Sequence, residues 1–161
     1  MFKRLISCIL ALFVSLCLFS CDSKIYGHAE MTVPLPQSYE SFESENFDKA
    51  YSDGKSVVAI YRISYQAAFN QGISDALTPE QFARFYMNRS ERKAEIKFHG
   101  TTPYYEYTAE TDGIRTSYLA SFFRSKYAYF LVLFASPENY YNELRSEFLY
   151  YVEGVIFSYD S

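Results

Sequence analysis

The stretch from Tyr127 to Ala135 constrains the fold more than any other part of this chain of 161 residues. It reads Tyr-Ala-Tyr-Phe-Leu-Val-Leu-Phe-Ala, without any alternation of polar and apolar residues. A strand of this composition has both of its faces buried. We therefore expect it at the centre of a sheet, with a helical layer on each side, or with helices on one side and a loop on the other.

Other segments are predicted strands because they are rich in β-branched and aromatic residues or are bounded by turn signals such as Asp53-Gly54 and Asp112-Gly113. They are residues 31–36, 47–51, 56–65, 94–98, 104–110 and 114–124. The prolines at 34 and 36 place the first of these at an edge, since proline cannot donate a ladder hydrogen bond.

Two helices are predicted from their start signals. Thr78-Pro79-Glu80-Gln81 combines an N-cap, a proline at the first helical position and a capping-box glutamine. Ser136-Pro137-Glu138 again places a cap before a proline, and Gly154 is the expected end of that helix. Residues 67–77 are expected to form an irregular connection. Strands joined by tight turns, with helices inserted and appended, indicate an α+β domain built on an antiparallel β-sheet flanked by helices.

The beginning of the chain is a segment of another kind. Lys3 and Arg4 precede an apolar run from Leu5 to Phe19, which is followed by Ser20 and Cys21. This order resembles the lipobox of bacterial lipoproteins, in which the cysteine receives a diacylglyceryl group and the preceding signal is removed. The resemblance implies three parts: a signal peptide at 1–20, a lipidated tether at 21–30 and a single domain at 31–161.

Lipidation at Cys21 would attach the protein to the extracytoplasmic side of a bacterial membrane. The apolar run of about 15 residues is shorter than the roughly 20 that a membrane-spanning helix needs. An ordinary secretory signal with an incidental cysteine is the alternative. Cys8 and Cys17 lie inside the signal, so Cys21 is the only cysteine of the predicted mature chain and no intramolecular disulfide is possible there.

The charge excludes some classes of partner. Removal of residues 1–20 leaves 13 basic and 19 acidic residues, a net charge of −6. A moderately acidic chain without a long basic run is a poor match for nucleic acid or for electrostatic binding to anionic lipid. We therefore predict no nucleic-acid partner.

The sequence predicts no catalytic group, no metal site and no cofactor. The only histidines, His28 and His99, share no ligand spacing. Glu106 and Glu110 fall on one face of a strand, which is the spacing of a solvated surface. A hydrolase built on dispersed glutamate and serine residues remains a third hypothesis. It would require ionisable side chains that are buried and close together, and a glycosidase-like acid pair would need one carboxyl with a raised pKa.

Aromatic residues are unusually frequent, with 17 tyrosines and 15 phenylalanines. Phenylalanines suit a core, whereas each buried tyrosine hydroxyl needs a hydrogen-bond partner. Several tyrosines of the predicted strands can share one exposed face, which would suit protein recognition or stacking on sugar rings. The alternative is a tyrosine-rich sheet that is half-buried. The candidate interaction face consists of Tyr61, Tyr65, Tyr105, Tyr107 and Tyr118.

The order of elements resembles a known family. Val33-Pro34-Leu35-Pro36, a long antiparallel sheet, and a last strand that passes through Ser136-Pro137 into a helix ending at Val155-Ile156-Phe157 together resemble the PsbP-like fold. That family includes extrinsic proteins of photosystem II and many small bacterial envelope lipoproteins. The resemblance implies an α/β/α sandwich and a non-enzymatic assembly or binding role.

The leading hypothesis is therefore a membrane-anchored, non-catalytic envelope lipoprotein that binds a protein partner close to the bilayer. The alternative is a lipoprotein that binds a small ligand or a glycan through its tyrosine-rich face.

Overall fold

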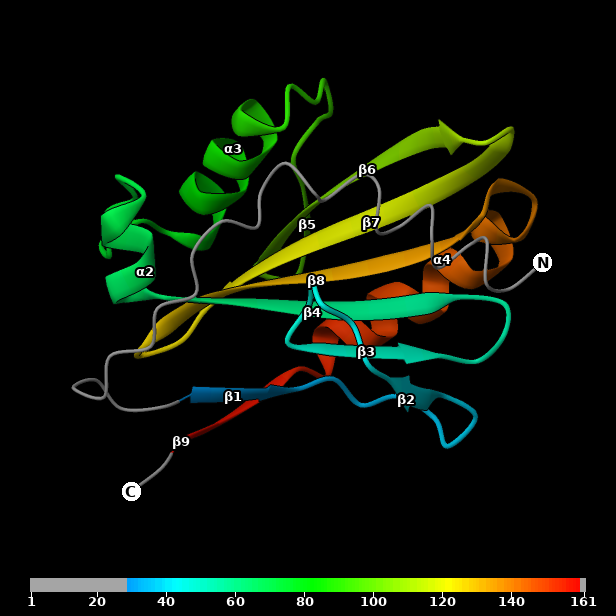
Figure 1. The fold of residues 1–161 in the computed structure, drawn as a ribbon, viewed down its shortest axis with the longest axis horizontal. Helices are drawn as coiled ribbons and strands as arrows, with labels where there is room; N and C mark the ends of the chain where they lie inside the picture. The colour runs from blue at the N-terminus through cyan, green and yellow to red at the C-terminus, as the bar shows by residue number, and fades with distance from the viewer. Residues whose placement is uncertain (1–28, 160–161) are drawn as a thin grey trace.

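The computed structural model describes residues 29–159, which form a large antiparallel sheet between two helical layers and a separate two-stranded ribbon (Figure 1). The large sheet has seven strands in the order β2-β3-β4-β8-β7-β6-β5. Its strands are β2 (Glu40–Phe42), β3 (Lys49–Ser52), β4 (Val57–Ser64), β5 (Lys97–His99), β6 (Thr102–Thr111), β7 (Ile114–Arg124) and β8 (Ala128–Pro137). The ribbon pairs β1 (Ala29–Thr32) with β9 (Ile156–Tyr159).

Strand β8 occupies the central position of the sheet, as the apolar stretch predicts. It pairs along its length with β4 on one side and β7 on the other. Every residue from Tyr129 to Ala135 is no more than 1% exposed. The odd-numbered residues of this stretch belong to one core and the even-numbered residues to the other. The predicted architecture, an α+β domain with an antiparallel sheet flanked by helices, is confirmed.

Helix α3 (Pro79–Arg89) covers one face of the sheet (Figure 1). Both hydrogen bonds of the predicted capping box between Thr78 and Gln81 are present. Phe82 stacks on Tyr129 of β8 with ring centroids 4.5 Å apart and meets Phe122 of β7 edge to face at 5.7 Å. The cap fixes where the helix begins, and these aromatic contacts fix how it lies on the sheet.

Helix α4 (Glu138–Glu153) covers the other face. Phe148 is fully buried and stacks on Phe134 of β8 at 5.1 Å. The helix ends at Gly154 as predicted, and a Cβ at this position would lie 2.5 Å from Cγ of Pro34. The glycine therefore allows the chain that follows β1 to pass close to the helix end.

The prediction that Ser136 caps α4 is wrong. Ser136 is the penultimate residue of β8, its side chain is buried, and its hydroxyl has no hydrogen-bond partner among the described residues. Pro137 occupies the N-cap position and supplies no side-chain hydrogen bond. Helix α4 therefore depends on packing of its inner face for its position, since its first turn lacks a side-chain cap.

The expectation of an irregular connection at 67–77 is also wrong in part. Residues Tyr65–Asn70 form helix α2, and the hydroxyl of Ser64 accepts a hydrogen bond of 3.2 Å from the backbone N–H of Ala67. The segment has fewer than two turns, so it shows no helical periodicity in the sequence. Its single fully buried residue, Ala68, holds it against the core.

The stacking of α4 on the sheet gives a test of the fold. Phe148→Ala removes a fully buried ring, so we expect the free energy of unfolding to fall by about 3–5 kcal/mol. Tyr150→Ala, two residues later on the exposed side of the helix, should change it by less than about 0.5 kcal/mol. Urea unfolding followed by circular dichroism measures both. Equal losses would contradict the assigned faces of α4.

Candidate functional site

The five tyrosines of the predicted interaction face all contribute to the core on the α3 side of the sheet, but they do not form one exposed patch. Tyr105 and Tyr118 are buried, with 1% and 2% of their surfaces exposed. Tyr61, Tyr65 and Tyr107 are partly buried and pack against that core. Tyr65 lies apart from the strand tyrosines, at the start of α2.

Tyr107 is the centre of a stack of three planar groups. Its ring lies parallel to that of Tyr118, with centroids 4.6 Å apart and an angle of 10° between the planes. The guanidinium carbon of Arg92 lies 3.8 Å from the centroid of the Tyr107 ring. Burial raises the pKa of Tyr107, although Arg92 opposes this effect, and burial raises the pKa of Tyr105 to about 12. These hydroxyls stay protonated, and Arg92 ties the connection after α3 to the sheet.

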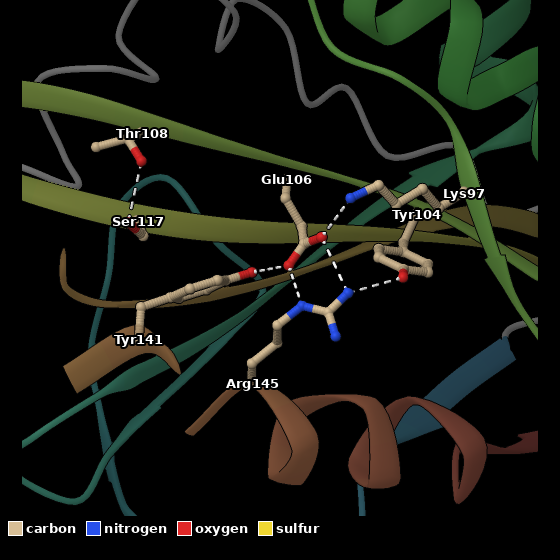
Figure 2. Close-up of polar contacts among 7 residues, drawn as sticks. All are labelled: Lys97, Tyr104, Glu106, Thr108, Ser117, Tyr141 and Arg145. Atoms are coloured by element: carbon tan, nitrogen blue, oxygen red, sulfur yellow. Dashed lines mark hydrogen bonds and ion pairs between the residues drawn. The ribbon is translucent and has the colours of Figure 1, made fainter. Parts of the chain in front are cut away.

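On the face of the sheet that α4 covers, Glu106 of β6 is the centre of a cluster of polar side chains from β5, β6 and α4 (Figure 2). Arg145 of α4 donates to both carboxylate oxygens, with distances of 2.7 Å to Oε1 and 3.1 Å to Oε2. The hydroxyl of Tyr141 donates to Oε1 at 2.6 Å, and Lys97 of β5 donates to Oε2 at 3.0 Å. Arg145 also donates to the hydroxyl of Tyr104 at 3.1 Å. We call these five residues the Glu106 cluster.

The cluster holds Glu106 in its charged form. Burial by itself would raise the pKa of this carboxyl, but the hydrogen bonds from Arg145, Tyr141 and Lys97 outweigh burial and lower the pKa to about 2. The same contacts raise the pKa of Arg145, while burial and the hydrogen bond to Glu106 raise the pKa of Tyr141. Glu106 is therefore ionised near neutral pH, the opposite of the protonated acid that a glycosidase pair needs.

A shallow hollow of about 310 Å³ opens beside the Glu106 cluster. Its walls come from β6, β7 and the first turns of α4, and they include Thr108 and Ser117, whose hydroxyls are hydrogen-bonded at 3.0 Å (Figure 2). Residues that line it are Glu106, Tyr107, Thr108, Ser117, Glu138, Tyr141 and Asn142. The hollow offers hydroxyl, amide and carboxylate groups, so it can form hydrogen bonds with a polar molecule.

The other residues considered for chemistry lie apart. Glu110 is exposed and pairs in register with Arg115 of β7, whereas Nε2 of His99 is 3.6 Å from Oε2 of Glu153. Within residues 29–159 no group of three or more histidine, cysteine, aspartate or glutamate side chains is arranged to hold a metal ion. Cys21 and His28 lie outside the described residues, as does the predicted signal peptide.

The sequence did not reveal the Glu106 cluster, because its partners are distant in the chain. Glu106 and Arg145 are separated by 39 positions. One local signal was available: Tyr141 and Arg145 are four residues apart on α4, so their side chains share a helix face. That spacing predicts that the two side chains are neighbours on α4, but it does not predict which strand they contact.

Comparison with known proteins gives similarity of structure only. No protein-family model and no curated protein matches the sequence. LpqN of Mycobacterium tuberculosis, described as involved in cell envelope biogenesis, is similar over 82% of this chain and 85% of that chain, with 9% identity and a TM-score of 0.52. The fold is thus shared with LpqN.

Two further solved structures have lower scores. PsbP (CyanoP) of Synechocystis is similar over 88% of this chain and 99% of that chain, with 12% identity and a TM-score of 0.43. A protein from Bacteroides thetaiotaomicron is similar over 68% of this chain, with 13% identity and a TM-score of 0.47. This chain spans only 38% of the length of the Bacteroides protein. No family membership follows from these values.

In the part of the chain that the structure describes, no helix is both long and apolar enough to cross a membrane.

The lowered pKa of Glu106 predicts a specific acid sensitivity. Because its pKa falls from 4.5 to about 2 on folding, Glu106 stabilises the fold above pH 4.5, and this contribution is lost as the pH falls toward 2. We expect ionised Glu106 to contribute about 2 kcal/mol to the free energy of unfolding, a value reduced because the cluster is partly exposed to solvent. Glu106→Gln should lower stability at pH 7 and reduce the further loss between pH 5 and 2.

Urea unfolding at several pH values measures this effect. Glu110→Gln is the matched control, since Glu110 lies on the same strand and is exposed. Glu110→Gln should keep the acid sensitivity of the unchanged protein. The same pH dependence in Glu106→Gln would show that the cluster does not stabilise the folded state.

Proposed function

We propose that this protein is a lipid-anchored, non-catalytic component of the bacterial cell envelope that binds a protein partner close to the membrane. The proposed anchor is Cys21, which follows the apolar run ending at Phe19. The described domain begins at Ala29, so the chain between anchor and domain is short. From Cys21 to Ala29 it can extend at most about 28 Å.

The similarity to LpqN supports the proposed setting. LpqN is described as involved in cell envelope biogenesis, and it shares the fold over most of both chains. At 9% identity this similarity concerns the fold alone, so it supports the envelope role without defining a partner.

Our reason for proposing a non-catalytic role is the state of the carboxylates. Glu106 is held ionised by Arg145 and Lys97, and it links α4 to the sheet. Glu110 is exposed on the same strand. A hydrolase of the kind considered from the sequence would need a buried carboxyl with a raised pKa. Neither residue has that environment.

The observation that carries the proposal of a protein partner is a stripe on the outer side of α4. Tyr140 and Tyr150 are 43% and 69% exposed. Glu143 and Glu147 are exposed between them, and the four positions fall on one side of the helix at intervals of three and four residues. We call them the α4 stripe.

The α4 stripe suits a partner with basic side chains. Its carboxylates can pair with lysine or arginine, and its tyrosine rings can receive the same cations on their faces. The inner side of α4 is fixed by Phe148 and by the Glu106 cluster, so the stripe is presented on a rigid support. Tyrosine offers a large contact area at a low cost in conformational entropy.

The hollow beside the Glu106 cluster favours the second candidate function, the binding of a small polar ligand or glycan. Tyr141 supplies an aromatic ring, and Asn142, Thr108 and Ser117 supply hydrogen-bonding groups. Its open shape gives less enclosure than a typical small-molecule site. Thermal-shift screens and glycan arrays that yield no ligand would exclude this alternative.

Site-specific crosslinking tests the proposed partner. A photoreactive amino acid at position 140 or 150 of the full chain, in its native membranes, should give the same discrete protein adduct from both positions. Lys93, exposed on the connection after α3, is the control position and should not give it. The double charge reversal Glu143→Lys, Glu147→Lys should abolish the adduct, because a basic partner would be repelled. Adducts of equal yield from position 93 would contradict the assignment of the α4 stripe.

The mass of the intact protein purified from membranes tests the anchor. We expect the N-terminus to be Cys21 carrying a diacylglyceryl group, and we expect Cys21→Ser to release the protein from the membrane. A mature chain that begins at another residue, or an unmodified Cys21, would show that the secretory alternative is correct.

A further inference from the structure

The end of the domain where the described chain begins also brings together α2, the turn between β7 and β8, and the end of β9 (Figure 1). Ala29 is the register partner of Tyr159. The Tyr159 ring lies 6.0 Å from that of Tyr127, and the carbonyl of Tyr127 accepts a 3.2 Å hydrogen bond from the backbone N–H of Tyr65, the first residue of α2. These contacts join four separate segments into one surface, which we call the tether end.

The tether end exposes aromatic side chains. Phe69 of α2 is 72% exposed, the largest value among the exposed large apolar and aromatic side chains of the described residues. Tyr159 is 48% exposed, and Tyr127 is partly exposed. Phenylalanine side chains favour the acyl region of a bilayer, whereas tyrosines favour the level of the headgroups.

Two basic side chains lie beside aromatic rings of the tether end, Lys126 beside Tyr127 and Arg124 beside Tyr65. The ammonium of Lys126 lies 5.0 Å from the Tyr127 ring centroid, and Lys126 is exposed. Arg124 donates to the hydroxyl of Tyr65 at 2.9 Å and to the backbone carbonyl of Asp75 at 3.0 Å. Both acceptors of Arg124 are uncharged, and the nearby carboxylate of Asp75 offsets part of its positive charge.

Among residues 29–159, three carboxylates also belong to this region, and one of them, Asp48, lies with Arg62 in the hollow beside Ala29 and Lys49. The side chain of Asp75 is exposed in the connection after α2. Glu30, next to Ala29, lies 3.6 Å from the ammonium of Lys49, which offsets its charge. Within residues 29–159, the basic groups of the tether end therefore slightly outnumber its carboxylates, although the predicted mature chain has a net charge of −6.

The opposite end of the sheet has the reverse character. It holds the turn between β6 and β7 and the turn between β3 and β4 (Figure 1). Glu110 and Asp112 are exposed at the first of these turns, where Arg115 pairs with Glu138, and the second turn holds Asp53 and the exposed Lys55. Carboxylates therefore outnumber cations at this end among the described residues. An anionic surface would repel this end and attract the tether end. These electrostatic forces act only over about one Debye length, which is about 8 Å at physiological ionic strength.

We propose that the tether end is a membrane-contact surface that docks the domain on a bilayer rich in anionic lipid. Phe69 enters the acyl region, Tyr127 and Tyr159 lie among the headgroups, and Arg124 and Lys126 contact lipid phosphates. This inference rests on the proposed lipid anchor, because a chain of at most about 28 Å from Cys21 brings this end to the membrane.

Fluorescence from single positions of the lipidated protein tests the proposal. The lipid occupies the thiol of Cys21, so Phe69→Cys supplies one free thiol for an environment-sensitive dye. Vesicles contain either phosphatidylglycerol with phosphatidylethanolamine or phosphatidylcholine alone, and some carry brominated acyl chains. We expect blue-shifted emission and bromine quenching at position 69 in the anionic vesicles. Asp112→Cys, at the opposite end, is the matched control and should show neither.

Lys126→Gln adds a second readout. Loss of one cation near an anionic surface should weaken docking about five-fold, with little effect on folding because this side chain is exposed. Added salt should weaken docking of the unchanged protein in the same way.

The outcomes separate this inference from the proposed function. Intact mass is measured first, and an unmodified Cys21 overturns both proposals. A lipidated, vesicle-bound protein whose dye at position 69 stays in water overturns the membrane-contact surface and leaves the proposed function standing. Emission that changes only when a second protein is added also overturns it, because the tether end would then bind protein.

Discussion

The burial of β8 on both faces is the constraint on which the rest of the structure depends. Because its residues from Tyr129 to Ala135 are no more than 1% exposed, the sheet must be covered twice. Helix α3 provides one cover through Phe82, and α4 provides the other through Phe148. Each cover then has an outer side that is free of the core, and the proposed contact with a partner uses the outer side of α4.

The Glu106 cluster adds a polar connection to this apolar framework. Helix α4 has no side-chain cap at its start, and Ser136, expected to be that cap, lies in β8. Arg145 instead ties the helix to β6 through two hydrogen bonds with Glu106, and Lys97 extends the connection to β5. Tyr104 and Tyr141 of the cluster are buried in the core, whereas Arg145, Lys97 and Glu106 are partly exposed, so the charges keep part of their hydration and the cost of burying them is limited.

The predicted tyrosine face shows which features of a strand its sequence pattern can predict and which it cannot. Alternation along the strands correctly places Tyr105 and Tyr107 on one face, and both join the core below α3 and the following connection. Alternation does not show which face a helix covers, so the exposure of these residues could not be predicted. The exposed Tyr140 and Tyr150 were not singled out, because an amphipathic helix of unknown orientation gives no reason to choose its outer tyrosines.

By itself, the sequence determined the α+β class, the central strand, the start of α3 and the end of α4, since these follow from local periodicity and from the preferences of capping, proline and glycine residues. It also supplied the prediction of a lipid anchor at Cys21, which lies outside the described residues. Only the tertiary structure decided that Glu106 meets Arg145 across 39 positions and that the start of β1, the turn between β7 and β8, and α2 share one end of the domain. Such arrangements depend on strand order and helix placement, which arise from burial of the whole sheet rather than from any local pattern.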